Sequence, residues 1–407
     1  MSFERFIADR FMPRKGAAGS FSGPLTAIAV ASIALGVLVM VMAISILRGF
    51  QADIRGKVVG FGGHIAVASY GSARAYEELP IEADSLLVAN LQATEGISHV
   101  QRVASIGGMA KTDDQIYGLL LRGLGSEADT TFLAASLVEG HLPAFGQGGG
   151  EVMVSTTIAS RLRLGVGERL RTYFWQGETY RSRAFTICGL YNTDLADMDE
   201  LYIVGDLAQV QRLHGWSDQQ VGGLELTVAD FSTLDATTQR VAYQLPFDMK
   251  VETIVGRNPA LFSWLDLLNA NITLILGLMC IVCVVAIVSA LLIMIFEKSA
   301  TIGLLKALGT TSASLRRIFL IKAARIIALG VAIGDVAGLL LSFVQLRYHL
   351  LALNPESYSM SHVPVEINLW VYLAISLGTI AVCLLALLLP TAYISRISPA
   401  RTMRIEN

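Results

Sequence analysis

The stretch LNANITLILGLMCIVCVVAIVSALLIMIF, residues 268–296, decides the fold class because it contains no Asp, Glu, Lys or Arg. A helix of roughly 20 apolar residues crosses the ~30 Å hydrocarbon core of a bilayer, so this stretch is long enough to span a membrane. Residues 25–47 and 369–389 are likewise free of charge, and a further apolar stretch at 320–346 has Asp335 near its middle. We therefore predict an α-helical membrane protein with four transmembrane helices.

The four predicted spans are arranged as one before and three after a large polar block. The first apolar run exceeds 20 residues, whereas the apolar core of a cleaved signal peptide has ~7 to 15, so we interpret it as an anchor. The predicted segments in chain order are an N-terminus (1–24), a first span (25–47), a large extracytoplasmic domain (48–266), a second span (267–296), a connecting segment (297–319), a third span (320–346), a loop (347–366), a fourth span (367–393) and a tail (394–407).

Lys and Arg in the short flanks predict the orientation, because cytoplasmic loops carry the positive excess. The positive residues gather before the first span, between the second and third, and after the fourth. They are Arg5, Arg10, Arg14, Lys15, Lys298, Lys306, Arg316, Arg317, Lys322, Arg325, Arg396, Arg401 and Arg404. Both termini are therefore expected in the cytoplasm and the large domain outside. That domain has more acidic than basic residues, and neither face of the protein suggests a nucleic-acid partner.

Alternating and helical patterns in the large domain predict two strand-helix-strand units. The first covers residues 63–70, 82–91 and 100–109, and the second covers 223–228, 232–244 and 249–254. Such a pair indicates a split ferredoxin-like α+β core. Between them, residues 115–221 are predicted to form a β-rich insertion. Trp175 is at a hairpin tip there, either as a periplasmic partner contact or, as we prefer, packed on its sheet.

The sequence offers no catalytic pattern. The six histidines are scattered without an HExxH motif, and no GxxxxGK[ST] motif is present to cradle ATP phosphates. We therefore expect no enzymatic activity, no metal site and no cofactor in this chain, with ATP and Mg bound by a partner subunit. Cys280 and Cys283 form a CxxC within an apolar span, where ordinary packing is the favoured interpretation.

The connecting segment FEKSATIGLLKALGTTSASLRRIF, residues 296–319, predicts a short amphipathic helix that Gly309 ends. Such a helix either lies on the lipid headgroups or docks into a groove on a cytoplasmic partner.

This segment, the opening LGVLVMVMAISILRGFQADIRGKVVGFGGHI (residues 35–65) and the one-plus-three layout resemble lipoprotein-releasing ABC permeases of the LolC and LolE type, within the FtsX and MacB superfamily. The stretch VSTTIASRLRLGVGERLRTY (residues 154–173) resembles the outer domain of that family. Two features differ: Thr301 stands where many relatives have an acid, and the hairpin at residues 174–180 is shorter than the hook of LolC-type subunits.

The resemblance implies a permease subunit in the bacterial inner membrane that extracts lipoproteins from the outer leaflet for delivery towards the outer membrane. Its implied partners are a pair of cytoplasmic ATPase subunits, a second permease subunit (a second copy or a related chain), the lipoprotein cargo, membrane lipids and, as an open alternative, a periplasmic lipoprotein carrier. The competing hypotheses are an FtsX-like subunit that regulates a cell-wall hydrolase and a MacB-like efflux or lipid-export permease.

The same resemblance assigns candidate residues. Coupling to the ATPase is expected at Glu297, Lys298, Ile302, Leu305, Lys306, Leu308 and Gly309, and a lipid cavity at Val39, Val41, Met42, Ile46, Leu47 and Phe50. From their spacing alone, Gly330, Gly334 and Gly338 predict close helix packing. Asp335 beside them is expected to bond a neighbouring helix, line a polar cavity or be protonated, with a proton relay as the sharper alternative.

Overall fold

The computed structural model describes residues 22–72, 78–112, 115–176, 179–353 and 360–393. The chain divides into two compact units. The helical unit comprises residues up to 51, 264–352 and 363 onward, and the sheet unit comprises residues 52–263 and 353–362. The predicted N-terminal segment before Ser22 and the tail after Tyr393 lie outside the described residues, as do most of the positive charges used to orient them.

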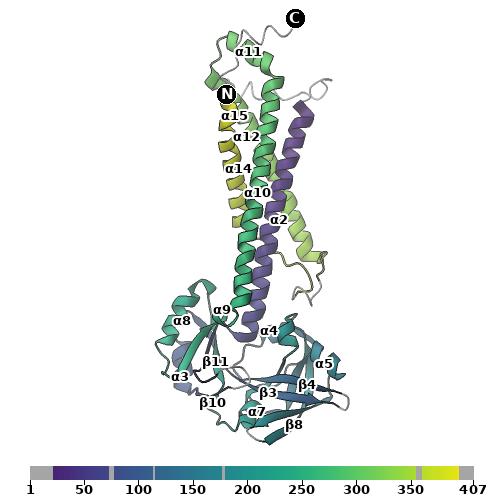
Figure 1. The fold of residues 1–407 in the computed structure, drawn as a ribbon, viewed down its shortest axis with the longest axis vertical. Coiled ribbons are helices and arrows are strands. Elements are labelled where there is room, and N and C mark those ends of the chain that lie inside the picture. Colours follow the sequence, from purple (N-terminus) through teal and green to yellow (C-terminus); the bar gives the residue numbers. More distant parts are fainter. Residues whose placement is uncertain (1–21, 73–77, 113–114, 177–178, 354–359, 394–407) are drawn as a thin grey trace. The chain divides into compact units, whose positions relative to one another are not determined.

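Four helices of the described chain are long and apolar enough to cross a membrane (Figure 1). They are α2 (Ser22–Gly62), α10 (Pro259–Glu297), α12 (Ser312–Tyr348) and α14 (Leu369–Ala386), with the shorter α11 (Ser299–Ala307) and α15 (Leu388–Tyr393) beside them. At 1.5 Å per residue, the 41 residues of α2 extend about 60 Å, twice the hydrocarbon thickness. The predicted end at Leu47 therefore marks the end of the apolar run, and the helix itself continues to Gly62.

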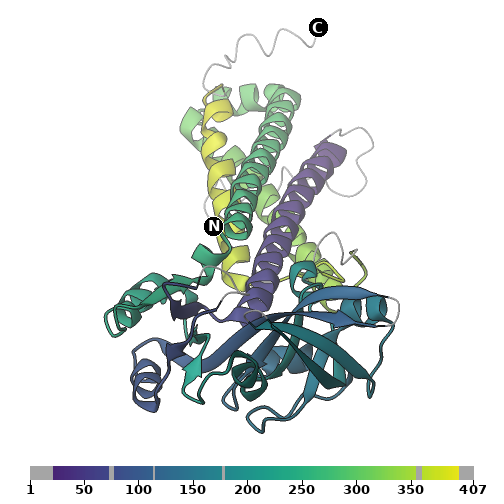
Figure 2. The ribbon, with the colours of Figure 1, turned by 60° about the horizontal axis from the view of Figure 1, so that its bottom comes forward.

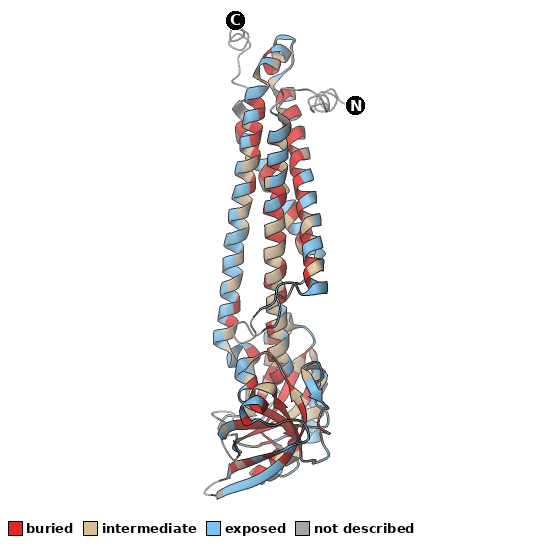
Figure 3. Cartoon of the chain, turned by 90° about the vertical axis from the view of Figure 1, so that its right-hand side faces the viewer, coloured by how far each residue is buried: buried red, intermediate tan, exposed pale blue. Residues whose placement is uncertain are grey.

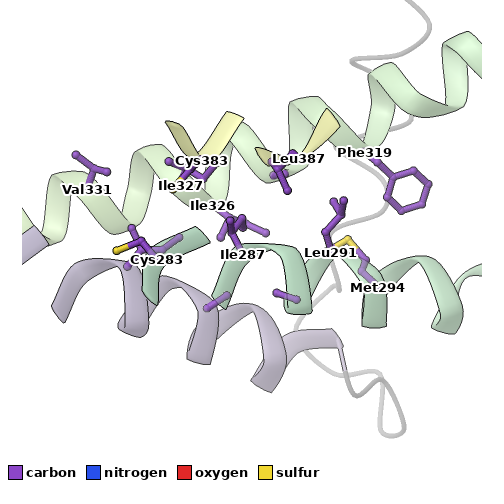
Figure 4. Close-up of a cluster of buried hydrophobic side chains, with 14 of the residues drawn as sticks. Cys283, Ile287, Leu291, Met294, Phe319, Ile326, Ile327, Val331, Cys383 and Leu387 are labelled. Atoms are coloured by element: carbon purple, nitrogen blue, oxygen red, sulfur yellow. The ribbon is translucent and has the colours of Figure 1, made fainter. Parts of the chain in front are cut away.

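The core of the helical unit draws side chains from all four long helices. Ile33 of α2, Cys283 and Ile287 of α10, Ile327 of α12 and Cys383 of α14 are at most 1% exposed and belong to one cluster (Figure 4). The opposite faces of these helices remain exposed along most of their length, as Figure 3 shows. Such apolar outer faces are what lipid-facing helices present.

The sheet unit is built on one ten-stranded sheet in the order β12-β1-β11-β3-β4-β9-β6-β8-β5, with β7 pairing with both β3 and β8 (Figure 2). A separate two-stranded sheet joins β2 to β10. The strands are β1 (Ile65–Ser69), β2 (Ile81–Glu82), β3 (Ile97–Lys111), β4 (Ile116–Leu124), β5 (Leu137–Gly140), β6 (Glu151–Ser155), β7 (Arg169–Gln176), β8 (Thr179–Tyr191), β9 (Tyr202–Asp206), β10 (Gln220–Val221), β11 (Gly223–Val228) and β12 (Met249–Thr253).

The β-rich insertion is continuous with the rest of the sheet. The 15-residue β3 pairs with β11 through its first half and with β4 through its second half. Backbone hydrogen bonds therefore join the strands of the insertion to those of the flanking segments, and the sequence-based separation into core and insertion does not correspond to a break in the sheet.

Short helices complete the sheet unit: α3 (Ser85–Gln92), α4 (Thr131–Ala135), α5 (Thr156–Leu162), α6 (Ala196–Asp199), α7 (Leu207–His214), η1 (Phe231–Thr233), α8 (Leu234–Ala242) and α9 (Ile254–Arg257). The predicted start of a helix at Glu82 was wrong. The Asp84 side chain accepts the Leu87 N–H at 2.7 Å and so begins α3 at Ser85, because an N-terminal cap satisfies an otherwise unpaired donor.

Candidate functional site

The predicted connecting helix is α11, held tightly between two spans. Lys298 alone separates it from α10. Gly309 follows α11 with a φ of +93°, a left-handed conformation that favours glycine, and its N–H donates to the Lys306 carbonyl. The Thr311 hydroxyl then accepts the Ser314 N–H and begins α12. This geometry leaves α11 little freedom to move independently of α10 and α12.

The apolar residues of α11 face in two directions. Ile302 is completely buried in the core cluster, and the partly buried Leu305 packs against the same cluster. Leu308 and Leu304 are 74% and 56% exposed. The predicted docking set is therefore divided: Ile302 and Leu305 anchor the helix, whereas Leu308 and Leu304, which the sequence did not single out, form its outward apolar surface. Helical spacing alone did not indicate which face would point inward.

Charged residues stabilise the bend between α10 and α11. Lys298 Nζ lies 3.5 Å from Glu297 Oε1. The buried Lys322 of α12 lies close enough to both residues to interact with them electrostatically. Lys306 is half-buried in the last turn of α11. Glu297 and Lys298 are thus engaged within the chain, in addition to the contact with a partner that was predicted for them.

The three glycines of α12 lie directly against α2. A methyl group added to Gly330 would lie 2.8 Å from Ile33 Cβ. At Gly334 it would lie 2.7 Å from the Ala34 carbonyl oxygen and 2.8 Å from Val37 Cβ, and at Gly338 it would lie 2.8 Å from Val41 Cγ1. We call this contact the glycine seam. Small residues at every fourth position let two helices approach closely, so the seam fixes the first span against the third.

A cluster of hydroxyl groups connects α2, α12 and α14. The Tyr372 hydroxyl lies 2.7 Å from Ser45 Oγ and 3.2 Å from Ser342 Oγ, and all three side chains are buried. Ser45 also donates to the Val41 carbonyl at 2.8 Å. These residues were not predicted, although uncharged polar residues within apolar spans are a signal for such contacts.

Asp335 bonds a neighbouring helix. Ser376 Oγ of α14 lies 2.8 and 2.7 Å from its two carboxylate oxygens and also 2.9 Å from the Tyr372 carbonyl oxygen. Of the alternatives considered for Asp335, the interhelical hydrogen bond is the one present in this structure. It ties the third span to the fourth, on the helix that also carries the glycine seam.

The predicted lipid-cavity residues of α2 differ in exposure. Val41 is buried in the glycine seam and Leu47 is also buried, so neither presents its side chain to a cavity in this structure. Val39, Met42, Ile46 and Phe50 are half-buried. The Phe50 ring makes an edge contact with Trp264 at 5.4 Å between centroids.

Trp175 ends β7 on the hairpin and is 58% exposed. Its ring stands perpendicular to that of Tyr180 on β8, with 4.6 Å between centroids. The two residues are paired across the strands. The ring therefore packs on its cross-strand neighbour, as preferred, yet much of its surface remains open to solvent.

A polar pocket of about 200 Å³ lies within the sheet unit. Arg122 and Glu225 form a buried ion pair on its wall, with Nη2 and Oε2 2.6 Å apart. Glu78 lies beside it and accepts the Ser105 N–H at 2.6 Å. Burial raises the pKa of Glu78 to about 7, and the Ser105 hydrogen bond only partly opposes this rise.

Residues 26–243, more than half of the chain, match the family described as the MacB-like periplasmic core domain. The chain belongs to that family. Residues 273–399, which hold α11 and the last three spans, match the FtsX-like permease C-terminal domain. This MacB-like chain therefore combines a periplasmic core domain with a permease domain in one polypeptide.

Relatives of the MacB-like chain align over nearly its whole length. The lipoprotein-releasing system transmembrane protein LolC of Neisseria meningitidis is 24% identical over 100% of both chains. The corresponding LolE of Haemophilus influenzae is 21% identical over 91% of this chain and 92% of its own. Among solved structures, the periplasmic region of MacB from Actinobacillus actinomycetemcomitans has a TM-score of 0.36 and 14% identity, over 52% of this chain and 97% of that structure.

Proposed function

We propose that this chain is the transmembrane permease subunit of an ATP-driven transporter that extracts lipoproteins from the outer leaflet of the inner membrane for delivery towards the outer membrane. The observation that carries the proposal is the end-to-end similarity to proteins named as lipoprotein-releasing LolC. The permease match over residues 273–399 and the four apolar helices support the same conclusion.

The proposed complex contains a pair of cytoplasmic ATPase subunits that bind ATP and Mg, and a second permease subunit. Both termini and α11 lie in the cytoplasm, and the sheet unit lies in the periplasm with a split ferredoxin-like core formed by β12, β1, β11 and β3. A periplasmic carrier receives the lipoprotein after its release. The basic flanks and the MacB-like match support this orientation.

α11 is the proposed coupling helix. Leu304 and Leu308 form its contact with a groove on the ATPase, because they are its exposed large apolar side chains. Ile302 holds the helix to the core, so a displacement of α11 is transmitted to α10 and α12. The glycine seam and the Asp335–Ser376 bond carry the same motion to α2 and α14 as a rigid-body change.

Acyl chains of the cargo are proposed to contact the half-buried face of α2, at Val39, Met42 and Ile46. Each methylene that leaves the membrane costs ~0.8 kcal/mol, so the extraction of several acyl chains needs an ATP-driven cycle.

A regulatory subunit that activates a cell-wall hydrolase is the second candidate function, and the FtsX-like match favours it. A MacB-like efflux or lipid-export permease is the third. Transport of a lipoprotein distinguishes the first candidate from both.

The test uses the full chain purified with its ATPase partner and reconstituted in lipid, with a triacylated lipoprotein bound. ATP is expected to release the lipoprotein. Leu304→Ala/Leu308→Ala should reduce both ATPase binding and release at least about tenfold, since each buried leucine stabilises a complex by ~1.5 to 3 kcal/mol. The control is Leu274→Ala/Leu278→Ala, which alters two exposed leucines of α10. Failure of wild-type protein to bind or release any lipoprotein, with hydrolase binding instead, would overturn the proposal.

A further inference from the structure

Three metal-binding side chains from separate parts of the sequence meet in the sheet unit. A ring nitrogen of His141, a carboxylate oxygen of Glu151 and the Cys188 sulfur lie within 4.8 Å of one another. His141 directly follows β5, Glu151 is the first residue of β6, and Cys188 belongs to β8, which lies between those two strands. The cluster therefore spans three adjacent strands.

The backbone of β8 is irregular where it presents the thiol. In the parallel pairing of β6 with β8, Val152 is opposite Ile187 and Met153 is opposite Gly189, so Cys188 is the additional residue of a β-bulge. Bulges redirect side chains and are frequent beside functional sites. The buried Cys188 is thus displaced from the regular alternation of the strand.

Two glycines allow the His141 strand to approach Cys188. Gly140 has a φ of +85°, and a side chain there would overlap the Cys188 carbonyl oxygen. A side chain at Gly189 would come within 2.6 Å of the His141 carbonyl oxygen. With both positions free of side chains, the His141 N–H donates to the Cys188 carbonyl at 2.9 Å. The backbone thereby fixes the position of the imidazole beside the thiol.

The histidine has the tautomer that a metal ligand needs. His141 Nδ1 lies 2.9 Å from the Leu142 carbonyl oxygen. A carbonyl oxygen can only accept, so Nδ1 carries the proton and Nε2 retains its lone pair. Ligating histidines commonly donate their second ring N–H to a backbone carbonyl in this way. Because His141 is exposed, an ion can reach the cluster from solvent.

We propose that His141, Glu151 and Cys188 form a zinc site, with water as the fourth ligand. One imidazole nitrogen, one carboxylate oxygen and one thiolate form a donor set that Zn²⁺ binds tetrahedrally, at roughly 2.0 to 2.3 Å from each ligand. Such a tetrahedron separates its ligands by ~3.5 Å, so the three side chains need to close by about 1 Å. Bound zinc would crosslink β5, β6 and β8.

The experiment uses the full chain in detergent without a polyhistidine tag. We expect about one Zn²⁺ per chain after dialysis, and a thiolate-to-cobalt charge-transfer band when Co²⁺ replaces it. Cys188→Ala should abolish that band, and His141→Ala and Glu151→Gln should weaken Zn²⁺ binding at least about tenfold. The Cys280→Ser/Cys283→Ser variant is the matched control and should bind as the wild type does.

His141→Ala keeps the test independent of folding, because this exposed side chain can be removed without creating a buried cavity. Its melting temperature in chelator should equal that of the wild type, while zinc should raise the melting temperature of the wild type only. Zinc binding by Cys188→Ala at wild-type stoichiometry, or no binding by the wild type, would refute the site.

Discussion

Alanine substitution in the glycine seam should separate a clash with a side chain from a clash with the backbone. At Gly338 the new methyl group meets only Val41, at 2.8 and 3.3 Å from two of its carbons. Ordinary contact begins near 3.4 Å, so the nearer carbon has to move by about 0.6 Å, the difference between 3.4 and 2.8 Å. Overpacking of this kind costs ~1 to 3 kcal/mol. At Gly334 the methyl group also meets the Ala34 carbonyl oxygen, which cannot rotate away.

Val41→Ala should therefore rescue Gly338→Ala, whereas Val37→Ala should leave much of the cost of Gly334→Ala. In a double-mutant cycle we expect a favourable coupling of ~1 kcal/mol or more for the 338/41 pair, and a smaller one for the 334/37 pair. The assay is the denaturation of the full chain in detergent, followed by the reaction of the buried Cys283 and Cys383 with a thiol-reactive dye. A Cys188→Ser/Cys280→Ser background removes the other two thiols.

The matched controls are Gly277→Ala and Gly378→Ala, since a methyl group at either position meets no atom within 4 Å. Both variants should be neutral or slightly stabilised, because alanine favours a helix over glycine by up to ~1 kcal/mol. If Gly334→Ala and Gly338→Ala are as stable as these controls, the reasoning about the seam is refuted.

Two further predictions concern buried polar groups. Tyr372→Phe removes the hydroxyl shared by Ser45 and Ser342 and should destabilise the helical unit by ~0.6 to 1.7 kcal/mol in the same denaturation assay, whereas the exposed Trp370→Phe should change little. Because the folded-state pKa of Glu78 is raised from 4.5 to about 7, the sheet unit should lose up to roughly 3 kcal/mol of stability as pH rises through that interval, and Glu78→Gln should remove this loss. Thermal unfolding at pH 5 and pH 8 tests the second prediction, and equal pH dependence of the wild type and Glu78→Gln would contradict it.

Local hydropathy and local pattern determined much of this protein before any tertiary contact was known. The charge-free run at 268–296 is sufficient to predict a span, because backbone and side-chain burial in lipid depends on composition over one helix length. Strand β6 at 151–155 and helix α7 at 207–214 have the predicted limits, since Ser155 and Asp206 accept backbone N–H groups where helices α5 and α7 begin. These signals lie within a few residues of the element they specify.

Only the tertiary structure decided which residues meet. The spacing of Gly330, Gly334 and Gly338 indicated a contact surface, but its partner, α2, lies about 300 residues earlier in the chain. Ile302 and Leu304 are both apolar, and only packing against the core directs the first inward and the second outward. His141, Glu151 and Cys188 have no motif spacing, because strand pairing brings them together. Contacts between distant segments depend on register and packing, which a single sequence does not specify locally.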